Sequence, residues 1–125
     1  MPLTGACPNL LVNDVDAAIP WYRDELGFRV EKKLPGPPKG VLLVRDGVHL
    51  LLEETEADLA KRPAHCIDQF GVDALFYVDD ATALHEELRT KDVEMLHGDA
   101  DLPANATTFG IGTPERYIIV FAKHL

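Results

Sequence analysis

The 125-residue sequence has few cysteines, no long apolar run and fewer basic than acidic residues. Its two cysteines, Cys7 and Cys66, are too few for a disulfide framework, so we expect reduced thiols. The apolar runs are about as long as a strand, whereas a membrane span needs about 20 apolar residues. The N-terminus lacks a basic start followed by an apolar signal core. The sequence therefore predicts a cytoplasmic protein with no membrane partner.

Negative charge predominates, because 21 acidic residues stand against 12 basic ones and give a formal net charge of −9. A surface of this sign repels phosphate backbones and attracts cationic ligands, so we expect no nucleic-acid partner. Hydrophobic residues make up 46% and charged residues 26% of the chain, which is typical of a folded globular protein. The length predicts a single domain over residues 1–125.

The two halves of the chain repeat one order of elements: strand, helix, strand, strand, strand. Apolar patterning and turn residues predict the first set at 10–12, 15–26, 28–33, 41–45 and 48–53. The second set is predicted at 74–78, 81–91, 93–96, 107–111 and 117–122. The polar stretch between the two sets reads as a connector.

Polar residues that can cap a helix precede each predicted helix, and they fix the offset between the two halves of the repeat. Asn13 and Asp14 precede the first helix, and Asp79 and Asp80 precede the second. Their side-chain oxygens can accept the free N–H groups of a first helical turn. Asp80 follows Asp14 by 80 − 14 = 66 residues. We therefore predict a duplicated module, with module one at about 6–54, a connector at about 55–71 and module two at about 72–125.

The segment from Pro8 to Phe28, PNLLVNDVDAAIPWYRDELGF, resembles the opening of the vicinal oxygen chelate superfamily. This superfamily includes glyoxalase I, extradiol dioxygenases, fosfomycin resistance enzymes and bleomycin resistance proteins. The second half repeats the pattern with the run Phe76-Tyr77-Val78-Asp79-Asp80. The resemblance implies an α+β fold of two βαβββ modules, which form a curved open-barrel mixed sheet with a cleft and with helices on the outer face. It also implies a homodimer.

In enzymes of the superfamily, a divalent metal occupies the floor of the cleft. Carried over to this sequence, the resemblance places the ligand positions at Cys7, Leu51, Asp73 and Val120. A divalent site needs several N, O or S ligands, and the side chains of Leu51 and Val120 are hydrocarbon. We therefore expect no metal, no other cofactor and no catalytic residue of the metal-dependent kind.

Strand alternation divides the remaining strand residues between the two faces of each sheet. The face that carries the four positions above is expected to bind an organic ligand, because a mainly apolar concavity with a few polar groups suits one. The predicted ligand-binding residues are Asn9, Leu11, His49, Leu51, Glu53, Asp73, Tyr77, Ile118 and Val120. Alternatively, these side chains simply fill a small barrel. We interpret His49 as a hydrogen-bonded wall residue and His85 as a surface residue of the second helix.

Three functional hypotheses follow. In the first, the chain is a small-molecule-binding protein, similar to bleomycin resistance proteins, that sequesters a cationic or aromatic natural product. Asp73 and Glu53 would match the charge of that ligand and Tyr77 would stack on it. In the second, it is a metal-dependent lyase or dioxygenase with displaced ligands drawn from Cys7, His49, Glu53 and Asp73. In the third, it is a scaffold or regulatory module with a collapsed cleft.

Overall fold

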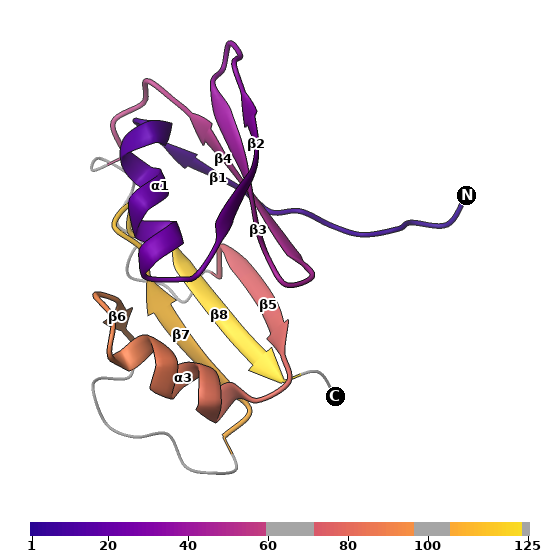
Figure 1. Ribbon diagram of the computed structural model, residues 1–125, viewed down its shortest axis with the longest axis vertical. Coiled ribbons are helices and arrows are strands. Elements are labelled where there is room, and N and C mark those ends of the chain that lie inside the picture. The colour runs from indigo at the N-terminus through magenta and orange to yellow at the C-terminus, as the bar shows by residue number, and fades with distance from the viewer. Residues whose placement is uncertain (60–71, 97–105, 124–125) are drawn as a thin grey trace. The chain divides into compact units, whose positions relative to one another are not determined.

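A computed structural model describes residues 1–59, 72–96 and 106–123. The chain divides into two compact units, Met1–Leu59 and Ala60–Leu125. Over its described residues, each unit contains one helix and four strands in the order βαβββ, and Figure 1 labels these elements. The predicted α+β class and the repeated order of elements are thereby confirmed. Most of the predicted connector, residues 60–71, lies outside the described residues.

The first unit consists of β1 (Asn9–Val12), α1 (Val15–Asp24), β2 (Arg29–Leu34), β3 (Gly40–Arg45) and β4 (Val48–Glu54). Its strands form one mixed sheet in the order β1-β4-β3-β2. Strand β1 runs parallel to β4, and the other neighbours are antiparallel. Asp46 in the turn between β3 and β4 has a φ of 51°, a conformation that Asp and Asn tolerate better than most side chains.

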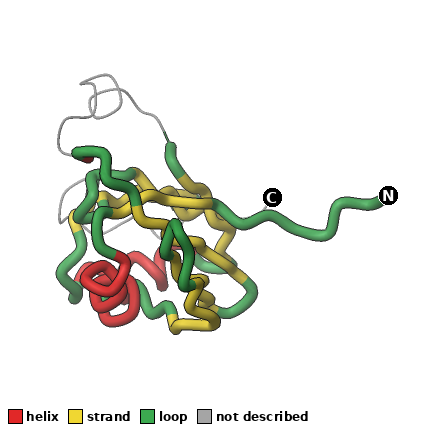
Figure 2. The backbone as a smooth tube through the Cα atoms, turned by 90° about the horizontal axis from the view of Figure 1, so that it is seen from above, coloured by secondary structure: helices red, strands yellow, loops and turns green. Residues whose placement is uncertain are grey.

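The second unit has the same topology. Its described elements are β5 (Ala74–Val78), α3 (Ala81–Arg89), β6 (Glu94–Met95), β7 (Thr108–Gly112) and β8 (Ile118–Lys123). The sheet order is β5-β8-β7-β6, with β5 parallel to β8. Both helices end two residues before their predicted ends, and β6 is shorter than predicted. Figure 2 shows the same elements from a second direction.

The two helices begin with the same cap, as the repeat predicts. The Asp14 carboxylate accepts a hydrogen bond from the Ala17 backbone N–H at 3.1 Å, and the Asp80 carboxylate accepts one from Ala83 at 3.0 Å. Each bond satisfies one of the N–H groups that a first helical turn leaves without a partner. After α1 the chain turns at Gly27, whose φ of 77° favours glycine.

The caps give a paired stability prediction. Asp14→Ala and Asp80→Ala should each lower the free energy of unfolding by about 1 kcal/mol, because each leaves an N–H without its acceptor. Asp14→Asn and Asp80→Asn keep an acceptor oxygen and should cost only a few tenths. Urea unfolding followed by circular dichroism measures all four variants. Equal losses for the Asn and Ala variants would contradict the capping role.

Each sheet buries one face against its own helix. Helix α1 contacts β2 and β4, and α3 contacts β7 and β8. The core of the first unit includes Leu10, Val12, Val15, Tyr22, Leu26, Leu43, Leu50 and Leu52. The core of the second unit includes Ala74, Phe76, Leu88, Phe109, Ile111, Ile119 and Phe121. None of the described helices is both long and apolar enough to span a membrane.

Candidate ligand-binding faces

The first unit presents an open sheet face along β1 and β4. In the register of these strands Asn9 lies beside Leu51, and Leu11 lies beside Glu53. The predicted ligand-binding residues of this unit are all exposed or half-buried: Asn9, Leu11, His49, Leu51 and Glu53. Their chain neighbours Leu10, Val12, Leu50 and Leu52 are buried. The structure therefore brings the five residues together on one accessible face.

Two polar pairs lie on this open face. The Asn9 amide donates a hydrogen bond to the Glu53 carboxylate at 3.3 Å. His49 Nε2 lies 2.9 Å from a Glu31 carboxylate oxygen. Glu31 is therefore a polar partner for His49, in keeping with the interpretation of His49 as a hydrogen-bonded wall residue. Sequence reasoning missed Glu31, because β2 is mostly charged and exposed and has no apolar alternation that would assign its side chains to a face.

The second unit presents a more apolar open face along β5 and β8. Leu75 lies beside Val120, and Tyr77 lies beside Ala122. Tyr77 is 61% exposed and Leu75 48% exposed, while Ile118 and Val120 are half-buried. Exposed aromatic and aliphatic groups on one rigid strand form a surface on which a ligand ring can stack.

Two glycines of β7 allow the edge strand β6 to reach over this face. Gly110 pairs with Val120, and Gly112 pairs with Ile118, so both lie on the open side of the sheet. A Cβ atom on Gly110 would meet a Leu96 methyl at 3.1 Å, and one on Gly112 would meet the Glu94 carboxylate at 3.0 Å. The sequence did not identify Leu96 and Glu94 as the residues over this face, although the Gly-x-Gly pattern inside a strand signals such a close approach.

Asp73, a predicted ligand-binding residue, is tied to the start of β8. Its carboxylate accepts a hydrogen bond from the Ile118 backbone N–H at 2.8 Å, and its own N–H donates to the Ile118 carbonyl at 2.9 Å. The backbone bond continues the β5–β8 pairing before Ala74, and the side-chain bond satisfies the Ile118 N–H. One carboxylate oxygen of Asp73 is therefore occupied by the backbone of its own sheet.

The four positions taken from the family's metal site do not form one here. Leu51 and Val120 hold matching places in the two sheets, beside Asn9 and Leu75, and neither can ligate a metal. Partial burial raises the pKa of the Cys7 thiol above its ordinary 9.0, partly offset by a hydrogen bond with the Leu51 backbone. The thiolate that binds metals is therefore disfavoured at neutral pH. Within the parts of the chain that the structure describes, no three His, Cys, Asp or Glu side chains gather as metal ligands would.

The prediction that His85 is a surface residue is wrong. His85 is only 3% exposed, and its ring packs edge-on against Phe109, with centroids 5.2 Å apart. Over the described ranges, its Nδ1 atom is buried without a hydrogen-bond partner. The helical spacing itself places His85 on the buried face, since it follows Ala81 by four residues and precedes Leu88 by three, and the prediction did not use this spacing.

Replacing His85 by leucine should therefore raise the free energy of unfolding by about 1 kcal/mol, because an apolar side chain removes the unsatisfied buried atom and keeps most of the packing. Differential scanning calorimetry measures the change. Ala83→Leu, at an exposed position of the same helix, is the matched control and should stay within about 0.5 kcal/mol. A clearly destabilised His85→Leu variant would show that the imidazole makes a polar contact essential to the unit.

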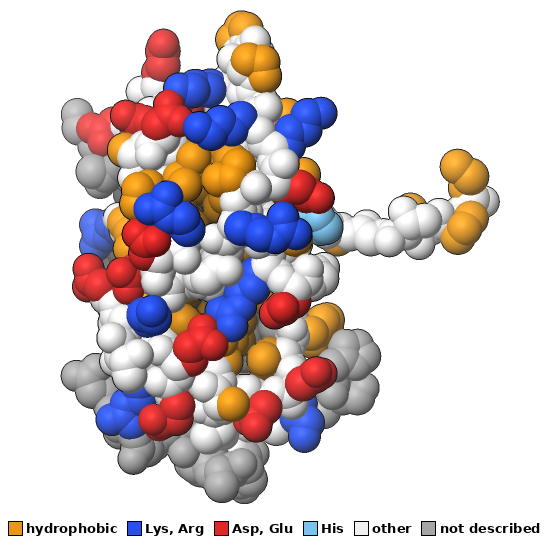
Figure 3. All heavy atoms as spheres, in the orientation of Figure 1, with side chains coloured by type: hydrophobic (Ala, Val, Ile, Leu, Met, Phe, Trp, Pro, Cys, Tyr) orange, Lys and Arg blue, Asp and Glu red, His pale blue; other side chains and the backbone are white. Residues whose placement is uncertain are grey.

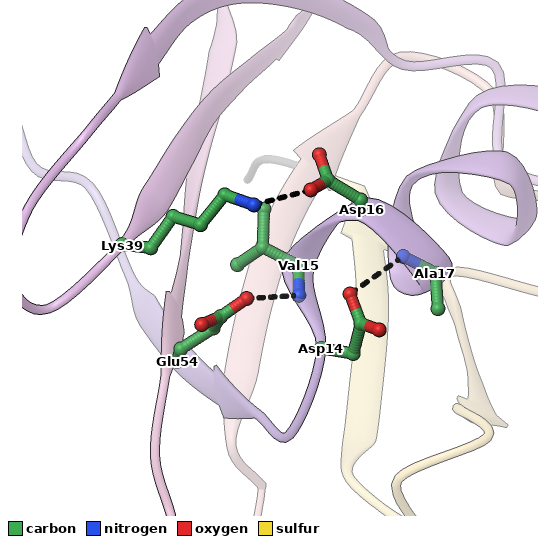
Figure 4. A network of polar contacts seen from close by, with 6 residues as sticks. All are labelled: Asp14, Val15, Asp16, Ala17, Lys39 and Glu54. Carbon is green, nitrogen blue, oxygen red and sulfur yellow. Dashed lines mark hydrogen bonds and ion pairs between the residues drawn. The ribbon is translucent and has the colours of Figure 1, made fainter.

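A separate polar cluster surrounds the start of α1 (Figure 4). A Glu54 carboxylate oxygen accepts a hydrogen bond from the Val15 backbone N–H at 3.0 Å. The Lys39 ammonium donates to the Asp16 carboxylate. This hydrogen bond, reinforced by the positive charge, lowers the pKa of the Asp16 carboxyl below its ordinary 3.8 and raises the pKa of Lys39. Both side chains are solvent-exposed, so the pair is screened by water.

The sign of the Asp16 shift gives a pH prediction. The pKa of Asp16 is lower in the folded than in the unfolded chain, so its contribution to stability is present above pH 3.8. That contribution is lost as the pH falls through the folded-state pKa. Carbon-13 NMR titration of the Asp16 carboxyl should give a midpoint below 3.8. In Lys39→Met the midpoint should return toward 3.8, and an unchanged midpoint would contradict the pairing.

Comparisons with known proteins identify the family and the fold of the chain. Residues 6–121 match the Glyoxalase/Bleomycin resistance protein/Dioxygenase superfamily, and the chain belongs to that superfamily. No curated protein sequence matches it. The fold is similar to that of UcmS2, with a TM-score of 0.75 and 17% identity over 99% of this chain and 100% of that one.

Two further solved structures share the fold. One is the bleomycin-binding protein from Streptomyces verticillus, complexed with copper(II)-bleomycin. It has a TM-score of 0.71 and 22% identity over 100% of this chain and 99% of that one. The other is the fosfomycin resistance protein FosX from Listeria monocytogenes, with a TM-score of 0.65 and 10% identity over 100% of this chain and 94% of that one. At these identities the likeness shows the fold alone.

Proposed function

We propose that this chain is a small-molecule-binding protein that sequesters a cationic or aromatic organic compound on its open sheet faces without metal catalysis. One observation carries the proposal: Leu51 and Val120 occupy equivalent, accessible positions on the two sheets. Hydrocarbon side chains at both positions suit an organic ligand and offer no Lewis acid. The bleomycin-binding protein of Streptomyces verticillus, which has the same fold, supports the choice of ligand class.

Each of the two faces offers its own kind of contact to such a ligand. In the second unit Tyr77 offers an exposed ring, and Leu75 and Val120 offer apolar area beside it. In the first unit the Glu53 carboxylate offers a negative charge, held in place by the Asn9 amide. The net charge of −9 favours the approach of cations over long range. On the face that Figure 3 shows, basic side chains are interspersed with acidic ones, so contact with a cation at close range depends on individual carboxylates.

Isothermal titration calorimetry with copper(II)-bleomycin, followed by a panel of cationic aromatic compounds, tests the proposal. We expect saturable binding, which Tyr77→Ala should weaken on the face of the second unit and Glu53→Gln on the face of the first. Asp46→Asn is the matched control, because it removes one carboxylate from an exposed turn and should leave the affinity unchanged. The absence of binding by every compound in the panel would overturn the proposal.

Metal analysis separates this function from the metal-dependent lyase or dioxygenase alternative. That alternative draws on Cys7, His49, Glu53 and Asp73, but His49 contacts Glu31 and Asp73 contacts the β8 backbone. A stoichiometric divalent metal found in the purified protein by elemental analysis, together with turnover that depends on it, would favour the enzyme.

We also propose that the protein is a cytoplasmic homodimer, which light scattering and cell fractionation test.

A further inference from the structure

The first unit contains a cavity of about 640 Å³ that none of the proposed sheet-face residues lines. The loop after β2 contributes the rings of Pro35, Pro37 and Pro38. The end of β4 and the residues after it contribute Glu54 and Glu56, and Asn13 follows from β1. This volume lies within the range that small organic ligands occupy in proteins.

Hydrogen bonds hold the polar walls of the cavity in place before any ligand arrives. The Asn13 amide donates to the Thr55 carbonyl at 2.9 Å and to the Ala57 carbonyl at 2.8 Å. Glu54 is held by the Val15 backbone N–H, and Lys39 is held by Asp16 (Figure 4). Fixed walls reduce the entropy lost when a ligand binds.

The groups that remain available in the cavity are hydrogen-bond acceptors. Both N–H groups of the Asn13 amide are used, which leaves its carbonyl oxygen. One oxygen of Glu54 accepts from Val15 and the other accepts no hydrogen bond in the described part of the chain. In the same part of the chain, the exposed Glu56 carboxylate makes neither a hydrogen bond nor an ion pair.

The charges in the cavity select the sign of its ligand. Lys39 is the one cationic side chain among the described residues that line the cavity. It pairs with Asp16 and also interacts with Glu54, and Glu56 adds a further carboxylate, so the described wall is negative overall. Proline rings provide apolar surface but no donors. A ligand that satisfies such a wall carries N–H donors and a positive charge at one end and an apolar body at the other.

We propose that the cavity between the proline loop and the end of β4 is a binding site for a protonated amine carried on an apolar ring or chain. The ammonium group donates to Glu54, Glu56 and the Asn13 carbonyl oxygen, and the apolar body packs on the proline rings. This site is separate from the open sheet faces and does not depend on their proposed function.

Two-dimensional 1H–15N NMR of the whole chain, titrated with phenethylammonium chloride, tests the site. We expect saturable shifts at the Asn13 side-chain amide and at the backbone amides of Lys39, Thr55 and Glu56. The neutral analogue 2-phenylethanol has the same apolar body and should bind more weakly. Glu56→Gln should raise the dissociation constant about two- to five-fold, the effect of one exposed ion pair. Asp46→Asn should not change it.

Three outcomes would overturn the site: equal binding of the amine and the alcohol, no saturable shift at the cavity residues, or an unchanged affinity in Glu56→Gln. The NMR spectrum of each variant also reports whether it is folded. Shifts confined to Leu51, Glu53 or Tyr77 would likewise exclude the cavity while supporting the sheet faces. Cavity shifts together with failed bleomycin binding would retain this site and remove the proposed function.

Discussion

Phe109→Ala should lower the free energy of unfolding by about 3–5 kcal/mol, the cost of emptying a packed aromatic site in a core. Phe109 is only 2% exposed, and its ring lies between those of His85 and Phe121, with centroids 5.2 and 5.3 Å away. It therefore joins α3 to both central strands of the second sheet. Chemical denaturation of the purified variant measures the loss.

Tyr77→Ala is the counterpart on the other face of the same sheet. Its side chain is 61% exposed, so its removal should cost less than about 1 kcal/mol, as is usual for surface positions. The effects on ligand affinity should be reversed: Tyr77→Ala should weaken binding more than Phe109→Ala, because Tyr77 is the proposed stacking residue and Phe109 lies in the core. If both substitutions cost the same stability, the sheet does not have one packed and one open face.

The second large effect is expected at neighbouring leucines of β4. Leu52 is fully buried, and Leu52→Ala should cost about 2–5 kcal/mol. Leu51 is half-buried on the open face, so Leu51→Ala should cost clearly less and should weaken ligand binding instead. Urea denaturation and calorimetric titration of the two variants separate these effects. A larger stability loss at Leu51 would mean that the open face is packed, as in the collapsed-cleft hypothesis.

The period-two pattern of the strands made the faces predictable from the sequence. In β1 and β4, a shift of one residue would place Leu10 and Leu50 outside and Asn9 and His49 inside, so burial strongly specifies the register. The helix caps were equally predictable, because Asp14 and Asp80 act through bonds to residues three positions away.

The particular residues that meet in contacts between strands were not predictable. Glu31 of β2 reaches His49 of β4 across β3, at the point where the register of β2 is irregular. Leu96 covers Gly110 because the edge strand β6 lies next to β7. The cavity depends on a proline loop and the end of β4 lying together, which no local pattern encodes.

The central claim is that the chain holds an organic ligand without a metal, and titration of metal-free bleomycin into chelator-treated protein tests it most directly. Calorimetry before and after exhaustive treatment with EDTA should give the same affinity, and the recovered ligand should be chemically unchanged. Binding that disappears on chelation and returns when a divalent metal is restored would contradict the claim. A converted product in the metal-restored sample would point instead to the enzyme alternative.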